Sequence, residues 1–536
     1  MDSAMAEPKR LSLAIAIAFG AGHAMPVHAQ LFPPEIDLSS LDSTNGFVLN
    51  GETIEDFSGG SVSAAGDING DGIDDLIIGA VGADPNGDYS GRSYLVFGST
   101  ANLSSSFNLS LINGLNGLFL NGEAESNESG RSVSGAGDIN GDGFDDLIIG
   151  AAAADPNGSL SGRSYVVFGS DSSLPNPVNL GSLNGLNGAF LNGEAALDFS
   201  GESVSRAGDI NGDGIDDLII GAPGADPNGS YSGRSYVFFG LNTGFPNPIN
   251  LSTLNGNNGF VINGETELDF SGTSVSAAGD VNGDGFDDLI IGAAAADSNG
   301  SLSGRSYVVF GSITDLPNPF HLSNLDGSNG FVINGEVAND SFGLSVSAAG
   351  DVNGDGIDDL VVGAPGAPGG GGPGRTYVIF GSNAGFQNPF NLSFLNGSNG
   401  FVLNGEDPGD GSGASVSAAG DINGDGIDDL IIGAPRADPN GSDSGRSYLV
   451  FGSSGDFSSP INLSTLNGSN GFVLNGEAAV DRSGSSVSAA GDINGDGIDD
   501  LIIGAPRADP NGSSSGRSYV VFGRGDAIFK DRFELK

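Results

Sequence analysis

One nine-residue run occurs seven times in this chain at a nearly constant spacing. The first copy extends from Asp67 to Asp75 with the sequence DINGDGIDD, and the other copies keep almost every residue. The copies begin 71 residues apart, except that 70 residues separate the fifth from the sixth. A fixed period of this length is typical of a repeat protein, in which each unit buries its apolar faces against its neighbours.

Each unit contains four short segments with the composition of β-strands. In the first unit these are residues 46–51, 61–66, 76–80 and 93–98. Turn-rich segments separate them, and no helical periodicity occurs. Four strands repeated seven times predict an all-β fold, a seven-bladed β-propeller of four-stranded antiparallel blades. An open solenoid is the alternative, but solenoids carry atypical end repeats and neither end unit is degenerate, which favours a closed ring.

The nine-residue run also has the pattern of a metal-binding loop. Asp67, Asn69, Asp71 and Asp75 provide oxygen atoms, Ile73 would add its backbone carbonyl, and a glycine at the sixth position permits a sharp turn. A shell of about six or seven oxygens suits calcium better than magnesium, which keeps more of its waters. The twelfth position is apolar, unlike that of an EF-hand, and an apolar strand follows, so the loop is expected between two strands.

All seven copies carry this ligand set, which predicts about seven Ca2+ ions, one in each repeat. We expect the ions to stiffen the loops, and because the carboxylates repel one another, folding should depend on metal. The eighth position, Asp74 in the first copy, is not assigned as a ligand. The predicted ligands are Asp67, Asn69, Asp71, Ile73, Asp75, Asp138, Asn140, Asp142, Phe144, Asp146, Asp209, Asn211, Asp213, Ile215, Asp217, Asp280, Asn282, Asp284, Phe286, Asp288, Asp351, Asn353, Asp355, Ile357, Asp359, Asp421, Asn423, Asp425, Ile427, Asp429, Asp492, Asn494, Asp496, Ile498 and Asp500.

Composition narrows the classes of function. The chain has no cysteine, so no disulfide can stiffen it. Its formal net charge of -49 argues against a nucleic-acid partner, because phosphates are bound by Lys and Arg. His321 is the only histidine after the first 29 residues and is expected to be an ordinary loop residue. With no repeated nucleophile or base other than the carboxylates assigned to metal, the sequence predicts no enzymatic activity.

Residues 1–29 have the pattern of a secretory signal peptide. Lys9 and Arg10 precede an apolar segment that ends in small residues, and we expect cleavage after Ala29. An uncleaved membrane anchor is disfavoured because glycines and a histidine interrupt the apolar run. The rest of the chain divides into a lead-in (30–45), the propeller (46–523) and a C-terminal tail (524–536), without a predicted transmembrane segment. The sequence therefore predicts a protein that is secreted or held at the cell surface.

The fifth repeat carries the motifs Phe342-Gly343, Ser345-Val346, Gly350, the loop from Asp351 to Asp359, and Gly363-Ala364-Pro365. With these motifs it resembles the FG-GAP repeat of integrin α-chain propellers and their bacterial relatives, and the resemblance extends over nearly all of residues 46–523. Other repeats depart from it, with Ser-Gly in place of Phe-Gly, as at Ser58-Gly59. The resemblance implies that SVSAAG is the innermost strand, and that residues 46–52 close the ring by completing the seventh blade.

A second pair of charged residues recurs in every repeat. One interpretation is an ion pair inside or between blades. The other is a ring of seven ligand pockets, which would make the protein a multivalent lectin. The pair consists of Glu52, Glu123, Glu194, Glu265, Glu336, Glu406 and Glu477 with Arg92, Arg163, Arg234, Arg305, Arg375, Arg446 and Arg517.

These observations predict a calcium-binding propeller that acts as an adhesion or protein-binding module. Its partner would be an extracellular protein or glycan. The alternatives are a carbohydrate-binding lectin with repeated pockets and a mainly structural surface protein. Two irregular segments stand apart from the repeats: the glycine-rich residues 366–374 of the fifth unit, and the tripeptide Arg524-Gly525-Asp526, which is a weak match to the sequence that integrins recognise.

Overall fold

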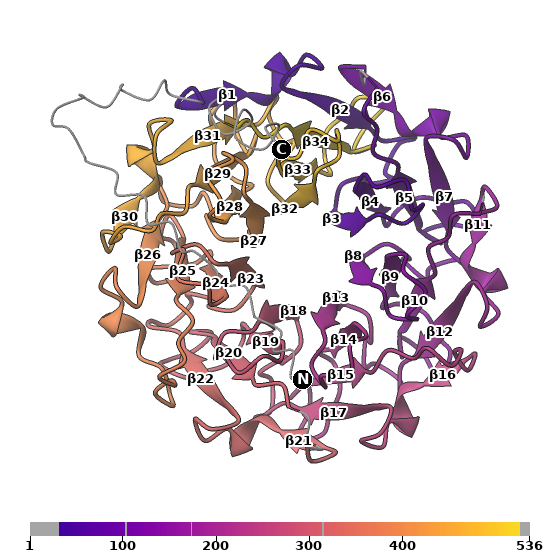
Figure 1. Cartoon of the computed structure of the whole chain (residues 1–536), viewed down its shortest axis with the longest axis horizontal. Coiled ribbons are helices and arrows are strands. Elements are labelled where there is room, and N and C mark those ends of the chain that lie inside the picture. The colour runs from indigo at the N-terminus through magenta and orange to yellow at the C-terminus, as the bar shows by residue number, and fades with distance from the viewer. Residues whose placement is uncertain (1–31, 102–103, 173, 313–315, 526–536) are drawn as a thin grey trace, which may run out of the picture. The chain divides into compact units, whose positions relative to one another are not determined.

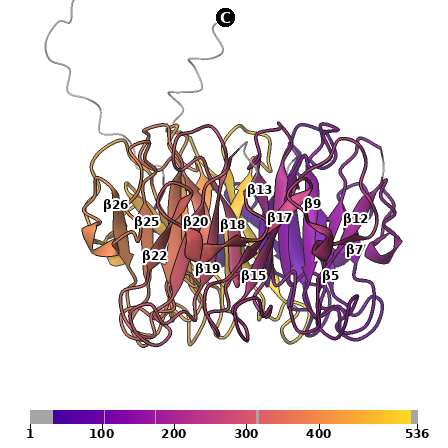
Figure 2. The ribbon, with the colours of Figure 1, turned by 90° about the horizontal axis from the view of Figure 1, so that it is seen from below.

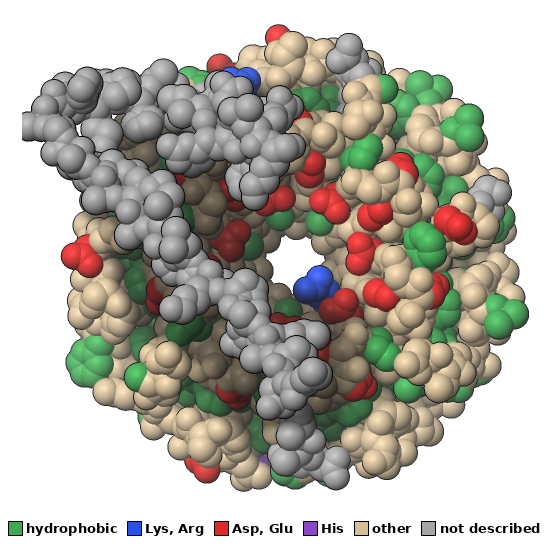
Figure 3. Space-filling model, in the orientation of Figure 1, with side chains coloured by type: hydrophobic (Ala, Val, Ile, Leu, Met, Phe, Trp, Pro, Cys, Tyr) green, Lys and Arg blue, Asp and Glu red, His purple; other side chains and the backbone are tan. Residues whose placement is uncertain are grey.

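Seven β-sheets stand around a central opening (Figures 1 and 3). The computed structural model describes residues 32–101, 104–172, 174–312 and 316–525, so the predicted signal peptide and most of the C-terminal tail lie outside the described residues. In each sheet four antiparallel strands follow one another from the centre outwards. The described chain is therefore the predicted all-β, seven-bladed β-propeller.

The two inner strands of each blade enclose the predicted metal loop. The innermost strand has the sequence SVSAAG or a close variant, as the resemblance implied, and it lies beside the opening (Figure 1). The innermost strands are β3 (Ser61–Gly66), β8 (Ser132–Gly137), β13 (Ser203–Gly208), β18 (Ser274–Gly279), β23 (Val346–Gly350), β27 (Ser415–Gly420) and β32 (Ser486–Gly491). The second strands are β4 (Asp75–Ala80), β9 (Asp146–Ala151), β14 (Asp217–Ala222), β19 (Asp288–Ala293), β24 (Asp359–Ala364), β28 (Asp429–Ala434) and β33 (Asp500–Ala505).

The two outer strands complete the antiparallel part of each blade. The third strands are β5 (Arg92–Val96), β10 (Arg163–Val167), β15 (Arg234–Phe238), β20 (Arg305–Val309), β25 (Arg375–Ile379), β29 (Arg446–Val450) and β34 (Arg517–Val521). The fourth strands are β7 (Gly117–Asn121), β12 (Gly188–Asn192), β17 (Gly259–Asn263), β22 (Gly330–Asn334), β26 (Gly400–Asn404), β31 (Gly471–Asn475) and β2 (Gly46–Asn50).

The apolar core lies between neighbouring blades. All six residues of β4 are buried, because a neighbouring blade covers each face of the sheet. Side chains of a strand alternate between its faces. Ile77 accordingly packs in a cluster with Ile149 of the second blade, whereas Ile78 packs with Ile502 of the seventh. The uninterrupted Leu-Ile-Ile run of the sequence is thus a strand buried on both faces, and each blade is stabilised by its two neighbours.

A short fifth strand, which the sequence analysis did not predict, lies outside the fourth strand in six blades. It runs parallel to the fourth strand, as where Val178 pairs with Leu120. In the fourth blade a single bridge between Ile333 and Phe390 takes its place. His321 belongs to one of these strands and so is not a loop residue. The fifth strands are β1 (Glu35–Asp37), β6 (Ser106–Asn108), β11 (Val178–Asn179), β16 (Ile249–Asn250), β21 (Phe320–His321) and β30 (Ile461–Asn462).

One turn of 3-10 helix recurs before each fourth strand. Its first leucine is buried in every copy. Among the described residues these turns are the only helices, and none could span a membrane. They are η1 (Leu38–Ser40), η2 (Leu109–Leu111), η3 (Leu180–Ser182), η4 (Leu251–Thr253), η5 (Leu322–Asn324), η6 (Leu392–Phe394) and η7 (Leu463–Thr465).

The ring closes through pairing between the two ends of the propeller. Strand β2 pairs antiparallel with β34, so that Gly46 lies opposite Val521. The prediction that residues 46–52 complete the seventh blade is confirmed. Strand β1 forms a second connection, because it pairs parallel with β31 at the outer edge of the sixth blade. No blade is left with an unpaired fourth position, which removes an open sheet edge.

The two faces of the ring carry different connections. The metal loop joins the end of β3 to the start of β4, whereas the hairpin 81–91 joins the end of β4 to the start of β5. Since these connections leave opposite ends of β4, they lie on opposite faces, which are the two layers of loops in the side view (Figure 2). We call them the metal-loop face and the hairpin face.

Candidate metal centres

Each predicted metal loop is a tight turn between the two innermost strands of its blade. In the first blade Gly70 and Gly72 have φ of 73° and 84°. These left-handed conformations are costly for residues with a side chain, and they turn the backbone sharply enough for the loop to begin and end on adjacent strands. The seven loops therefore lie at equivalent places close to the opening, around which acidic side chains gather in the space-filling view (Figure 3).

Backbone amides inside the loop hold its first and fifth residues. The carboxylate of Asp67 accepts hydrogen bonds from the N–H groups of Asp71 (3.0 Å) and Gly72 (2.8 Å). The carboxylate of Asp71 accepts one from the N–H of Ile73 (3.0 Å). All six other loops repeat these bonds. The loop is thus shaped by the same oxygen atoms that were predicted as metal ligands.

The ninth residue of the loop is a fully buried carboxylate. Asp75 is 0% exposed, and its carboxylate accepts hydrogen bonds from the N–H of Gly98 (2.9 Å) and the side-chain amide of Asn69 (3.4 Å). Burial raises the pKa of Asp75 to about 8, and the nearby charges of Asp71 and Asp67 add to the rise. The same elevation to about 8 occurs at Asp146, Asp217, Asp288, Asp359, Asp429 and Asp500.

The loop residues fit a hard divalent cation by type and position. Each loop contains four carboxylates and an amide within nine residues, and three of the carboxylates are predicted ligands. No Lys or Arg among the described residues pairs with Asp67, Asp71 or Asp75. A buried carboxylate beside other carboxylates needs a counter-charge. In the described residues, the acidic side chains of a loop do not point to one common metal position, because they accept hydrogen bonds from the loop amides. A carboxylate oxygen has further lone pairs, so these bonds leave room for a metal ion.

The unassigned eighth residue connects neighbouring blades. The carboxylate of Asp145 in the second blade accepts a hydrogen bond from the N–H of Asp67 in the first blade (2.8 Å). Asp74 does the same for Asp492 of the seventh blade (2.8 Å), so this chain of contacts passes across the closure. All seven loops are joined in this way, at distances between 2.8 and 3.0 Å.

A glycine before each loop makes room for this contact. Gly66 has φ of 72°, and a Cβ at this position would lie 2.3 Å from the Asp145 Oδ2 atom. The final glycine of the SVSAAG strand is thus required both by its backbone conformation and by the carboxylate of the next blade. Sequence analysis identified these residues as repeated but gave no sign of which copy each one contacts.

The recurring Glu and Arg residues form ion pairs between blades. Glu52 follows β2 of the seventh blade, and Arg92 of the first blade donates to its carboxylate. Arg92 also donates through Nε to Asn121 (2.9 Å), and the hydroxyl of Tyr94 donates to Glu52 (3.2 Å). The Arg92 side chain is only 17% exposed. All seven pairs are formed, so the interpretation as an ion pair between blades is the one that the geometry supports.

Serine hydroxyls add a third set of contacts between blades. The Ser486 hydroxyl of the seventh blade accepts a hydrogen bond from the N–H of Val62 in the first (3.1 Å). The same bond joins each innermost strand to its neighbour. Neighbouring blades are thus joined by three repeated sets of contacts, from serine, aspartate and arginine side chains.

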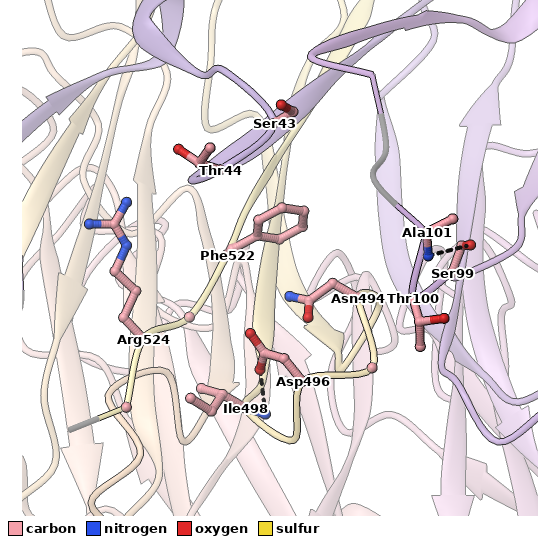
Figure 4. A pocket seen from close by; sticks show the side chains of 13 residues that line it. Ser43, Thr44, Ser99, Thr100, Ala101, Asn494, Asp496, Ile498, Phe522 and Arg524 are labelled. Carbon is pink, nitrogen blue, oxygen red and sulfur yellow. Dashed lines mark hydrogen bonds between the residues drawn. The ribbon is translucent and has the colours of Figure 1, made fainter. Parts of the chain in front are cut away.

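A cavity of about 790 Å³ adjoins the seventh metal loop at the ring closure (Figure 4). Asp496 of this loop accepts a hydrogen bond from the N–H of Ile498 (3.1 Å) at the edge of the cavity. Arg524 and Gly525 also line it, whereas Asp526 lies outside the described residues. The tripeptide at positions 524–526 therefore stays a match in the sequence alone. The side chains labelled in Figure 4 are Ser43, Thr44, Ser99, Thr100, Ala101, Asn494, Asp496, Ile498, Phe522 and Arg524.

Fold and site together define a seven-bladed propeller with one acidic loop at the same place in every blade. The sequence profile of the FG-GAP repeat matches seven segments of this chain, which make up just over half of its length. The chain therefore belongs to the FG-GAP repeat family. The matched segments are residues 58–96, 129–167, 200–238, 271–309, 342–379, 412–450 and 483–521.

Two groups of curated proteins are similar to this chain. Human phosphatidylinositol-glycan-specific phospholipase D is 28% identical over 404 residues, which are 72% of this chain and 45% of that protein. Integrin alpha pat-2 from Caenorhabditis elegans is 30% identical over 242 residues, which are 42% of this chain and 17% of that protein. The chain thus spans less than half the length of these relatives.

Among solved structures, the V. cholerae biofilm matrix protein Bap1 is similar over 89% of this chain and 90% of its own. The sequence identity is 13% and the TM-score is 0.32.

Proposed function

We propose that this protein is an exported, calcium-binding propeller that acts as an adhesion or protein-binding module and not as an enzyme. The observation that carries the proposal is the fully buried carboxylate at the ninth position of all seven loops, beside two further carboxylates of the same loop. A cation at each loop would neutralise this charge.

The residues that would hold calcium in the first loop are Asp67, Asn69, Asp71 and Asp75, with the backbone carbonyl of Ile73. Bound calcium would supply positive charge where the loop concentrates negative charge, and it would join the end of β3 to the start of β4. Because Asp67 also donates its N–H to Asp145, a loop ordered by calcium would in turn position its neighbour's carboxylate. Calcium would thereby stabilise the contacts between blades.

Support for a binding role comes from the relatives and from the residues. Integrin alpha chains are among the curated relatives. The phospholipase D relatives are named as enzymes, but this chain spans 45% of the human protein and has no cysteine and one histidine after the signal peptide. Export is supported by the charged and apolar pattern of residues 1–29. The partner we propose is an extracellular protein or glycan.

The first experiment is a titration of calcium into the chelator-stripped protein without its leader. We expect about seven ions per chain, with a rise in the melting temperature, because an ion that binds only the folded state stabilises it. Magnesium at the same concentration should bind more weakly. Binding of far fewer ions, or binding without stabilisation, would refute the ligand assignment.

A single-loop variant makes the test specific. Asp288→Asn removes one charge from the buried position of the fourth loop while its shape is kept, and it should lower the stoichiometry by about one ion. The control is Asp297→Asn, in the hairpin of the same blade, which should leave the stoichiometry unchanged. An unaltered stoichiometry in Asp288→Asn would contradict the assignment of this residue.

The binding role is tested by adhesion of beads coated with the calcium-loaded protein to a panel of cells and immobilised matrix proteins. We expect saturable adhesion with one ligand per ring, lost on chelation. Inhibition by a simple sugar at several equivalent sites would instead support a multivalent lectin. Absence of adhesion to every surface, with calcium bound, would refute the adhesion proposal and favour a structural role.

A further inference from the structure

At two junctions between neighbouring blades, a pair of side chains makes contact on the hairpin face. One residue comes from the hairpin tip of a blade and the other precedes the innermost strand of the next blade. At the junction of the third and fourth blades, Tyr231 and Phe270 are stacked with ring centroids 5.2 Å apart. At the junction of the sixth and seventh blades, Asp443 and Arg482 form an ion pair at 3.1 Å. In both cases the N–H of the second residue donates to the carbonyl of the first.

The junction between the fifth and sixth blades lacks this pair. The hairpin of the fifth blade is the irregular glycine-rich segment of residues 366–374 and has no side chain at the place of Tyr231. In the sixth blade, Gly411 stands where other blades have Phe57, Phe199 or Phe270. A Cβ at Gly371, Gly409 or Gly411 would meet no atom within 4 Å. The missing side chains leave a cavity of about 410 Å³.

Two arginines line this cavity. Arg436 is exposed, and no carboxylate among the described residues forms an ion pair with it. Arg482 donates through Nη2 to Asp443, but its Nε atom is buried and has no hydrogen-bond partner. Arg436 stands where the first five blades have Gly or Ala, so the positive charge is specific to this part of the ring.

Asp443 is paired with Arg482, and the two carboxylates next in sequence to lining residues accept hydrogen bonds from backbone amides. Asp340 accepts a hydrogen bond from the N–H of Gly369 (2.7 Å), and Asp410 accepts one from the N–H of Asp407 (3.3 Å). Neither side chain lines the cavity. In a protein with a formal net charge of -49, the cavity therefore presents two guanidinium groups without an acidic side chain among its lining residues.

We propose that the cavity between the fifth and sixth blades on the hairpin face binds one small carboxylate-bearing sugar, of the uronate class. The planar guanidinium groups match a carboxylate in geometry and charge. The volume lies within the range of about 300–1,000 Å³ that ligand pockets occupy. The walls of glycine backbone, with Pro365 and Pro435, offer polar groups and apolar surface to a sugar ring. This site is single and does not depend on the proposed role of the metal loops.

The test is a calorimetric titration of the calcium-loaded full chain with D-glucuronate, with D-glucose and acetate as comparison ligands. We expect one glucuronate site per chain and weaker binding of both comparison ligands. Arg436→Gln and Arg482→Gln should each weaken binding about ten- to hundredfold, which is the loss expected for one charged hydrogen bond. Arg507→Gln is the matched control, because Arg507 is the equivalent of Arg436 in the seventh blade and does not line the cavity.

A variant that fills the cavity distinguishes loss of the binding site from loss of folding. Gly411→Phe introduces the residue that the first, third and fourth blades carry at this position, where the backbone is left-handed in all of them, with φ of 69° at Gly411 and 53° at Phe199. It should abolish glucuronate binding while the melting temperature stays close to that of the wild type. The proposal is overturned if glucuronate does not bind saturably, if Gly411→Phe or both arginine variants bind as the wild type does, if Arg507→Gln is equally damaging, or if glucose or acetate binds as tightly.

Discussion

Replacement of Gly208 by alanine tests whether the carboxylates that join the metal loops stabilise the ring. Gly208 ends β13 with φ of 70°, and its Cβ would lie 2.2 Å from the Asp287 Oδ2 atom. Asp287 would have to move, which breaks its hydrogen bond to the N–H of Asp209 (2.8 Å). A left-handed backbone costs a residue with a side chain about 1–2 kcal/mol, and loss of a charged hydrogen bond costs about 1.5–3 kcal/mol. We therefore expect a loss of about 2.5–5 kcal/mol in the free energy of unfolding.

Gly256→Ala is the matched control. Gly256 has φ of 95°, but its Cβ would meet no atom within 4 Å. This variant should lose only the backbone contribution, about 1–2 kcal/mol. Urea unfolding, followed by the fluorescence of the buried tyrosines, measures both losses, because the chain contains no tryptophan.

A double-mutant cycle identifies the cause. In an Asp287→Ala background the added Cβ has room, so Gly208→Ala should then cost only about 1–2 kcal/mol. If Gly208→Ala costs the same in both backgrounds, or no more than Gly256→Ala, the contact between loops does not contribute to stability and the reasoning is wrong.

Three further substitutions test individual residues. Arg305→Met should lower the free energy of unfolding by about 2–4 kcal/mol, because it leaves Glu265 and Asn334 of a partly buried network without their donor. The control Arg131→Met, at a side chain that is 43% exposed, should lower it by less than about 1 kcal/mol. Similar losses for both variants in urea unfolding would contradict a structural role of the Glu265–Arg305 pair. Tyr307→Phe should cost about 1 kcal/mol because its hydroxyl donates to Glu265 (3.1 Å), but Tyr448→Phe should cost nothing because the Tyr448 hydroxyl is buried without a partner; equal effects on the urea midpoint would argue against these assignments. Burial raises the pKa of Asp198 to about 6 from 3.8, so the folded state holds this proton more tightly, and the stabilising contribution is present below about pH 4 and lost as the pH rises through 6. Asp198→Asn should therefore gain stability relative to the wild type between pH 4 and pH 7 in thermal melts, and a constant difference would refute this.

The strands and their order could be predicted from the sequence because their signals are local. The apolar run of Leu76, Ile77 and Ile78 and the glycines around it indicate a buried strand without knowledge of its neighbours. The predicted segments 61–66 and 76–80 agree with β3 and β4 to within one residue. The strand that closes the ring could be predicted because no SVSAAG segment precedes the first GFVLNG segment.

The contacts between blades could not be predicted, because a repeat hides them. Every copy carries the same Asp, Arg, Glu and Ser. The sequence pattern therefore shows that these residues recur, but it does not show which repeat supplies the residue that each one contacts. Asp145 contacts Asp67, 78 positions away, and Arg92 contacts Glu52, 40 positions away. The missing pair at the junction of the fifth and sixth blades was visible in sequence only as an irregular glycine-rich segment. Its effect depends on Gly411 of the next repeat, which only the fold brings near.

The pairing of β2 with β34 imposes an order on the assembly of the chain. Residues 46–50 must wait for residues 517–521, so the last blade cannot form until almost the whole polypeptide has been made. Contacts at such separation in sequence are slow to form. A chain that is cut short before residue 517 would lose β34, and β2 would then keep only its parallel pairing with β6. The seventh blade therefore forms only in a chain that contains both β2 and β34, so synthesis must pass residue 521 before the ring can close.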